Sequence, residues 1–354
     1  MSASDVKRCS RCILPENYPD VNFDAQGECS YCRAYQKIAY LGSSRLREDL
    51  AKHRRTGGEH DCLVPVSGGK DSAFVLLQMT RVYGMRVLAF HYDNCLIHDV
   101  ARENLRQLTD ALGVELITKR NERQKQHLGI NLRAYVRSPS LGMVPMLCTG
   151  CRYGIVGNAF KLARQKNIPM VVIGWSPIED TPFKEAYLKG GGKSVLRGLL
   201  RNLLKNPAYV RWGNMVAAAR DYCHSYSHVR GNSFLLRLMY PGVKLIQFYD
   251  YVPYAPGQIQ ETVQRELNWR APKEQDSWQF DCRVKLIQDY LYRQEVGFTA
   301  ADGYLSAMVR EGLLTRCEAL ERLECCRKDG EEAINRLQKF LADANLRDMI
   351  YRFS

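Results

Sequence analysis

The sequence predicts an α/β fold, a doubly wound parallel sheet with a cysteine-rich segment before it and a mostly helical region after it. Four short apolar runs suit buried parallel strands, at residues 63–66, 87–90, 114–117 and 170–173. Helical spacing fills the intervals 71–83, 98–112 and 151–166. Strand–helix alternation at this pace is typical of a doubly wound sheet, whose ligands bind at the carboxyl ends of the strands.

Composition agrees with a globular enzyme. The chain has 354 residues, of which 45% are hydrophobic and 25% charged, which excludes a disordered chain. No apolar run reaches the roughly 18–20 residues of a membrane helix, and the first residues lack the apolar core of a secretory signal. We therefore expect a cytoplasmic protein with a cysteine-rich segment over 1–40, an α/β domain over 55–182 and a helical, basic region over 183–354.

Charge and cysteine content carry further information. The formal net charge is +13, and the segment 184–244 holds 11 Lys and Arg against only Glu185 and Asp221. Such an excess favours an anionic partner. The chain also has 13 cysteines. An odd number without an export signal argues against a disulfide framework and for metal or thiol chemistry.

A phosphate-binding loop follows the first predicted strand. The strand ends at Val66 and runs into SGGKDS, residues 67–72, before a helix. Glycines let the backbone approach an anion, the helix start offers free N–H groups, and the Ser67 and Ser72 hydroxyls and Lys70 add donors. The Walker spacing is absent.

This six-residue motif resembles the signature of the PP-loop, or N-type ATP pyrophosphatase, family. The resemblance implies that ATP is cleaved between its α and β phosphates, that AMP is transferred to a carbonyl oxygen, and that pyrophosphate leaves with Mg²⁺. It implies catalytic roles for Lys70, Asp71 and Asp93. The ATP-binding residues it implies are Val66, Ser67, Gly68, Gly69, Lys70, Asp71, Ser72, His91, Asp93 and Gly174.

Four cysteines near the N-terminus have the spacing of a metal site. Cys9 and Cys12 form one CxxC pair, and Cys29 and Cys32 form a second pair after a short loop. Two such pairs close a tetrahedral four-thiolate site, which suits Zn²⁺. Because a closed site leaves no open coordination position, we expect folding energy and a docking surface from it, not catalysis.

A second pair, Cys148 and Cys151, opens the predicted helix at 151–166. A helix N-terminus lowers thiol pKa values, so this pair is predicted to be thiolate. In sulfur-inserting PP-loop enzymes a similar pair and a third cysteine hold an iron–sulfur cluster, and Cys223 or Cys282 could supply the third ligand here. A second zinc site and a purely structural motif are the alternatives.

Two terminal segments extend the resemblance. CSRCILP (9–15) with FDAQGECSYC (23–32), and LSAMVREGLLTR (305–316), are similar to the opening and the end of N-acetyl sugar amidotransferases of surface-polysaccharide biosynthesis. That family implies conversion of the N-acetyl amide of a nucleotide sugar to an acetamidine, with the amide oxygen adenylated and ammonia displacing it. Cys317, where relatives carry Glu, and the basic 184–244 segment depart from the family pattern.

The resemblance also implies partners. The relatives receive ammonia from a separate glutaminase that works with a barrel subunit. This sequence has no GxCxG nucleophile elbow for glutamine hydrolysis, and Cys9 is not N-terminal, so a glutaminase partner is expected.

Two other interpretations remain open. A tRNA-thiolating PP-loop enzyme would also combine CxxC pairs with a basic surface bearing tyrosines and tryptophan; neither enzyme involves DNA. Residues 194–206 place six Val and Leu side chains on one side and basic side chains on the other. This pattern fits peripheral contact with an anionic membrane or a partner, although a core-facing amphipathic helix is the preferred interpretation.

Overall fold

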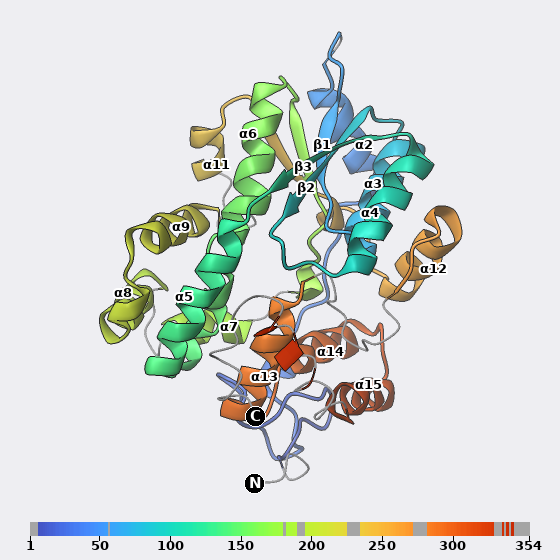
Figure 1. Ribbon diagram of the computed structural model, residues 1–354. Helices are drawn as coiled ribbons and strands as arrows, with labels where there is room; N and C mark the ends of the chain where they lie inside the picture. Colours follow the sequence, from blue (N-terminus) through green and yellow to red (C-terminus); the bar gives the residue numbers. More distant parts are fainter. Residues whose placement is uncertain are drawn as a thin grey trace.

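The structure is a computed structural model that describes residues 6–55, 57–179, 182–189, 195–224, 234–271 and 282–328, with 335, 338, 339, 341 and 342. A sheet with helices on both faces occupies the upper half of Figure 1. Below it lie three helices and the N-terminal segment. These helices are α13 (Val284–Val296), α14 (Ala300–Glu311) and α15 (Arg316–Lys328).

The sheet, in the part of the chain described, has five parallel strands in the order β3–β2–β1–β4–β5. They are β1 (Cys62–Pro65), β2 (Val87–Asp93), β3 (Glu115–Arg120), β4 (Met170–Ile173) and β5 (Lys244–Gln247). The first four confirm the predicted strands. The fifth was not predicted, because KLIQ has only two apolar residues, between Lys244 and Gln247, and so is not an apolar run. The strand order reverses between β1 and β4, which places a ligand-binding crevice at the carboxyl ends of these two strands.

Alternate residues of β1 face two apolar layers, as the period of a strand requires. Val64 packs toward four helices on one face: α2 (Ser43–His53), α3 (Lys70–Leu77), α4 (Asp99–Leu112) and α12 (Pro256–Leu267). Leu63 packs toward the other face, which is covered by η4 (Tyr153–Gly157), α6 (Asn158–Gln165) and α11 (Phe234–Met239). With η1 (Gln78–Val82) continuing α3, these elements confirm the three predicted helical intervals.

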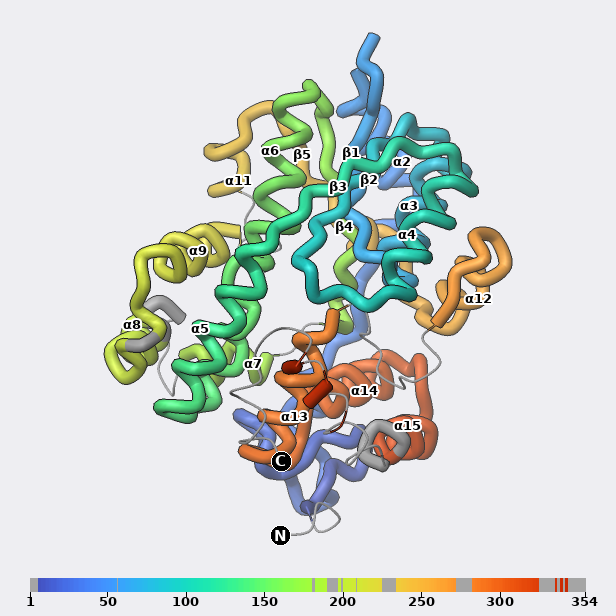
Figure 2. The backbone as a smooth tube through the Cα atoms, viewed as in Figure 1, coloured from blue at the N-terminus to red at the C-terminus, as the bar shows by residue number. Residues whose placement is uncertain are grey.

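A second core joins the ends of the sequence. It contains the four N-terminal cysteines together with apolar residues of α5 (Arg123–Arg137), α13 and α14. Figure 2 shows the blue N-terminal segment against the orange and red C-terminal helices. Short elements complete this half: α1 (Ser30–Arg33), α7 (Pro182–Lys189), η2 (Leu141–Met143), η3 (Pro145–Cys148) and η6 (Pro207–Tyr209). Two others, η5 (Pro177–Glu179) and η7 (Phe248–Asp250), pack into the core of the sheet.

The basic segment forms α8 (Val195–Lys205) and α9 (Trp212–Cys223), which lie beside α5 in Figure 1. The core-facing interpretation of 194–206 is wrong for two of its six apolar side chains, because Leu200 is 52% and Leu204 85% exposed. Leu203, on the same helix, is half-buried and packs against the second core. None of the described helices combines the length and hydrophobicity that a membrane crossing requires.

Candidate active site

The SGGKDS loop connects the end of central strand β1 to the first turn of α3. Gly68 has a φ of +85°, and a Cβ atom there would lie 2.2 Å from the carbonyl oxygen of Ala101. Only glycine therefore fits between the loop and α4. The Ser67 backbone N–H donates to the Ser72 hydroxyl (3.2 Å), and the Gly69 N–H donates to the Ser67 hydroxyl (3.3 Å). No side chain caps the start of α3, which leaves its first N–H groups for an anion.

Two residues that the sequence did not single out hold this loop from outside. The Trp269 indole N–H donates to the Gly68 carbonyl at 2.9 Å, and the Asn104 amide donates to the same oxygen at 3.3 Å. Asn104 also exchanges hydrogen bonds with the backbone of Arg270, at 2.9 and 3.0 Å. The loop is thus fixed by both α4 and the segment after α12 before any ligand binds.

Lys70 is the cation of the loop and is only 8% exposed. Its Nζ lies 2.9 and 2.8 Å from the two carboxylate oxygens of Asp71 and donates to the Tyr254 hydroxyl at 3.1 Å. Tyr254 in turn lies 3.3 Å, oxygen to oxygen, from Tyr304 on α14. Asp71 is therefore the counter-ion of Lys70 in this structure, and an arriving phosphate would compete for the same ammonium.

The other predicted nucleotide residues lie at neighbouring strand ends. His91 is buried, and its Nδ1 is 2.8 Å from the Val66 carbonyl oxygen. Asp93 accepts from Arg102 at 2.8 Å and from the Cys95 N–H at 2.8 Å. Burial alone would raise the pKa of Asp93, but these hydrogen bonds hold it below its ordinary value.

Gly174 ends β4 beside the same crevice. A Cβ atom at Gly174 would lie 2.7 Å from Val75 and 3.4 Å from the Asp71 carbonyl oxygen, so β4 approaches α3 too closely for a side chain. The structure therefore gathers all the predicted ATP-binding residues along the carboxyl edge of β1, β2 and β4.

The four N-terminal cysteines form one buried group. Cys9 and Cys32 have sulfurs 3.8 Å apart, and the sulfurs of Cys12 and Cys29 are 3.7 Å apart. All four ligand atoms lie within 4.8 Å of one another. The N–H groups of Cys12 and Cys29 donate to the Cys9 sulfur, at 3.4 and 3.2 Å. Hydrogen bonds from the Cys29 and Cys32 thiols lower the pKa of Cys12, whereas the hydrogen bonds with Cys12 raise the pKa of Cys29 and Cys32. The fit to a tetrahedral metal ion therefore rests on the closeness of the four sulfurs.

This cysteine knuckle, residues 9–32, is docked on α14 and α15. The Ile13 N–H donates to the Ser306 hydroxyl at 3.3 Å, and Arg310 reaches the Cys12 sulfur at 3.7 Å. Arg316 donates to the carbonyl oxygens of Cys9 (3.1 Å) and Cys12 (3.0 Å). The two segments on which the family resemblance rests are therefore in direct contact.

A second cysteine group lies beside the end of β2. The Asn94 amide nitrogen is 3.8 Å from the Cys151 sulfur and 3.5 Å from the Cys282 sulfur. The Gln288 amide nitrogen is 3.4 Å from the Cys148 sulfur. We call Cys148, Cys151 and Cys282 the inner cysteine group.

Of the two tentative third ligands, Cys282 lies with the pair. Besides burial, Cys148 and Cys282 both raise the pKa of Cys151 through their charge, which places them near it, whereas Cys223 ends α9. The three inner sulfurs do not all lie within 4.8 Å of one another. That spacing is loose for one tetrahedral ion, and a cluster, being bulkier, needs its thiolates further apart.

The inner pair does not have the lowered pKa predicted from its place at a helix start. Burial raises the pKa of Cys148, and burial with the neighbouring Cys148 and Cys282 raises that of Cys151 well above its ordinary value. Asp221 of α9 accepts from the N–H groups of Gly150 and Tyr153 and so occupies the helix start. Without a metal, these thiols are therefore neutral near pH 7.

Cations nevertheless surround Cys148. Lys184, Arg152 and Lys285 each oppose the rise in its pKa. Burial lowers the pKa of Lys184 itself to about 8, with nearby Lys285 adding to the shift. A negatively charged metal–thiolate group would find compensating charge here.

Comparisons with known proteins were made for the whole chain. No family model matches it, and no curated protein matches its sequence. The U34-tRNA thiolase NcsA from Methanococcus maripaludis, solved with its [4Fe-4S] cluster, is 13% identical, with a TM-score of 0.35, and covers 87% of this chain and 86% of its own. The NH3-dependent NAD synthetase from Campylobacter jejuni subsp. jejuni NCTC 11168, in complex with the nitrate ion, is 16% identical, with a TM-score of 0.27, and covers 66% and 98%. At these identities and TM-scores neither likeness carries an argument about substrate or reaction.

Proposed function

We propose that this protein is an ATP-dependent enzyme that adenylates the amide oxygen of an N-acetylated nucleotide sugar and replaces it with ammonia, giving an acetamidino sugar for a surface polysaccharide. The observation that carries the proposal is the loop at residues 67–72, which opens from a central parallel strand onto an uncapped helix start. The contact between the two segments that resemble sugar amidotransferases supports the choice among ATP-cleaving reactions.

The chain's part in the reaction follows from the geometry of the loop. The first N–H groups of α3 and the Lys70 ammonium would bind the phosphates that leave as pyrophosphate. Lys70 then exchanges its contact with Asp71 for the phosphate oxygens. A carboxylate next to the phosphates suits Mg²⁺, so Asp71, once released, is the residue that would hold it; the ion would offset phosphate charge. Asp93 stays with Arg102 and orients what binds at the end of β2.

The test is product analysis. The protein is incubated with Mg-ATP, ammonium and N-acetylated nucleotide sugars, and the masses of the products are measured by mass spectrometry. Replacement of one amide oxygen by NH, with AMP formed in step, is expected. Lys70→Ala should reduce pyrophosphate release at least about a thousandfold, as the loss of a transition-state charge partner does. Lys52→Ala on the exposed end of α2 is the matched control and should leave the rate unchanged. Retained turnover in Lys70→Ala would remove the loop from catalysis.

A second candidate function, tRNA thiolation, is favoured by the inner cysteine group. Cys148, Cys151 and Cys282 lie together next to the strand end that carries Asp93. These three thiolates could hold an iron–sulfur cluster, which would supply an iron with an open coordination position for sulfur transfer. Sulfur gain on bulk tRNA, with no amide exchange on any sugar, would establish this function in place of amidination.

A further inference from the structure

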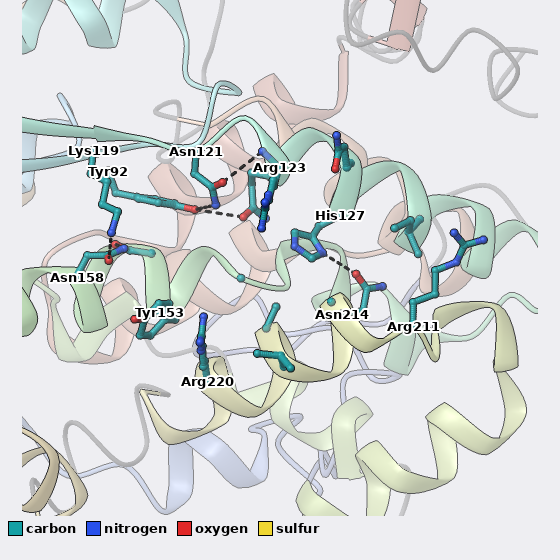
Figure 3. A pocket seen from close by; sticks show the side chains of 18 of the residues that line it. Tyr92, Lys119, Asn121, Arg123, His127, Tyr153, Asn158, Arg211, Asn214 and Arg220 are labelled. Carbon is teal, nitrogen blue, oxygen red and sulfur yellow. Dashed lines mark hydrogen bonds between the residues drawn. The ribbon is translucent and has the colours of Figure 1, made fainter.

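A cavity of about 990 Å³ lies between the ends of β2 and β3, α5, η4 and α9. It adjoins the proposed ATP site but is distinct from the loop. Tyr92 lines the cavity, whereas the next residue, Asp93, faces Arg102 on α4, because successive side chains of a strand point to opposite faces. Figure 3 looks into this space, with α5 along one side and α9 along the other.

The wall of the cavity is strongly cationic. Among the described lining residues there is no carboxylate, and six are Lys or Arg: Lys119, Arg120, Arg123, Lys161, Arg211 and Arg220. Within the part of the chain that the structure describes, only Arg120 among these six has an acidic partner, Glu122 at 3.3 Å. Lys119 donates to the neutral amide of Asn158 at 2.7 Å, and Arg220 lies over the Tyr153 ring at 5.1 Å.

The other three cations of the cavity wall have no acidic partner among the described residues. In the part of the chain described, Arg123, Lys161 and Arg211 form no ion pair. Figure 3 shows Arg123 and Arg220 entering the same space from opposite helices. Like charges gathered in one concave site raise the local potential and favour an anion that can contact several of them at once.

The shape and the aromatic lining narrow the class of anion. Trp212, the first residue of α9, lines the cavity and is 85% exposed. Its indole ring offers a flat surface on which a base can stack. The volume is in the range of pockets that enclose one small molecule. A hollow bounded by helices on two sides suits a compact polyanion better than the continuous track that an RNA backbone needs.

We propose that this cavity binds the nucleoside diphosphate part of a nucleotide-activated sugar. This proposal rests on the proposed function, which supplies the nucleotide sugar as substrate. Arg123 and Arg211 bind the diphosphate, and Trp212 stacks on the base. The sugar then lies at the Tyr92 end, nearest to the strand edge where ATP is expected. This arrangement assigns to the basic 184–244 segment a role in substrate binding through α9.

The experiment is calorimetric titration of the full chain with UDP and with GDP. Binding is expected, and the double variant Arg123→Gln with Arg211→Gln should weaken it at least about tenfold, because two charge-assisted hydrogen bonds are lost. Both side chains are exposed, so the variant should melt like the parent protein. Arg137→Gln, at the exposed end of α5 outside the cavity, is the matched control. Trp212→Phe should remove the quenching of tryptophan fluorescence that accompanies binding.

The proposal would be overturned if neither UDP nor GDP binds, or if the double variant binds them as tightly as the parent protein. So would binding of bulk tRNA that requires Arg123 and Arg211 and that UDP and GDP do not displace. The product assay separates this proposal from the proposed function. If the double variant carries out amide exchange at the rate of the parent protein, only the proposal that the cavity binds the nucleotide is wrong. If the parent protein binds nucleotide and the double variant does not, but no sugar is converted, only the proposed amidination is wrong.

Discussion

The two cysteine groups of this protein differ in how many sulfurs they bring together and in how closely those sulfurs approach one another. The cysteine knuckle places four buried sulfurs in pairs less than 4 Å apart, with backbone N–H groups donating to them. The inner cysteine group brings three sulfurs together more loosely, and side-chain amides of Asn94 and Gln288 face them. A closed set of four thiolates suits a structural ion, whereas three leave a coordination position for chemistry. We therefore propose different roles for CxxC pairs of the same spacing, a structural metal site in the knuckle and a site for chemistry in the inner cysteine group.

Removal of one knuckle thiolate should have the largest effect. Cys29→Ser is expected to lose the bound metal and on the order of several kcal/mol of stability, since metal binding and folding are coupled in such sites. Elemental analysis and thermal unfolding measure the two losses. Cys317→Ser, which changes an exposed cysteine, should alter neither quantity. A folded parent protein purified without any metal would contradict the knuckle as a metal site.

The inner group should respond differently. Cys151→Ser or Cys282→Ser is expected to abolish the iron absorbance of anaerobically purified protein while the metal content of the knuckle stays the same. The stability cost should be smaller, about 1–2 kcal/mol, as for one altered buried side chain. If Cys148→Ser leaves both activity and metal content unchanged, the inner group is only structural.

Thiol reactivity sharpens the comparison further. In protein that keeps the knuckle metal but holds none at the inner cysteine group, iodoacetamide at pH 7.5 should modify exposed Cys317 before Cys148 and Cys151. Burial raises the pKa of both inner thiols, so their thiolate fraction, and with it their alkylation rate, should increase only as the pH rises above 9. Peptide mass spectrometry reads each site separately. Rapid labelling of the inner pair at neutral pH would contradict this order.

The smallest expected effect concerns docking of the knuckle. Arg316→Ala removes two hydrogen bonds to the carbonyl oxygens of Cys9 and Cys12, which should cost about 1–2 kcal/mol without loss of metal. Urea unfolding followed by far-UV circular dichroism measures the change. Arg322→Ala, on an exposed position of the same helix, provides the comparison. An equal loss in both variants would mean that helix propensity, not docking, is responsible.

The sequence predicted those features that depend on residues close together in the chain. Apolar runs located four strands, and the loop motif located the turn from β1 into the uncapped start of α3, because both depend on neighbouring residues. The supports of that site could not be predicted. Trp269 and Asn104 reach the Gly68 carbonyl from distant parts of the chain, and nothing in their surroundings marks them. Nor could spacing choose Cys282 over Cys223, because backbone pairing of Cys282 with Ile97 makes that choice.

The knuckle's dependence on α14 and α15 has a consequence for the order of folding. Its four sulfurs come from 24 consecutive residues, 9–32, so the segment can capture a metal through short-range closure alone. Its docking partners Ser306, Arg310 and Arg316 lie almost 300 positions further on. Contacts of such high sequence separation form late. We therefore expect the knuckle to bind its metal early as a local module and to close onto α14 and α15 late in folding.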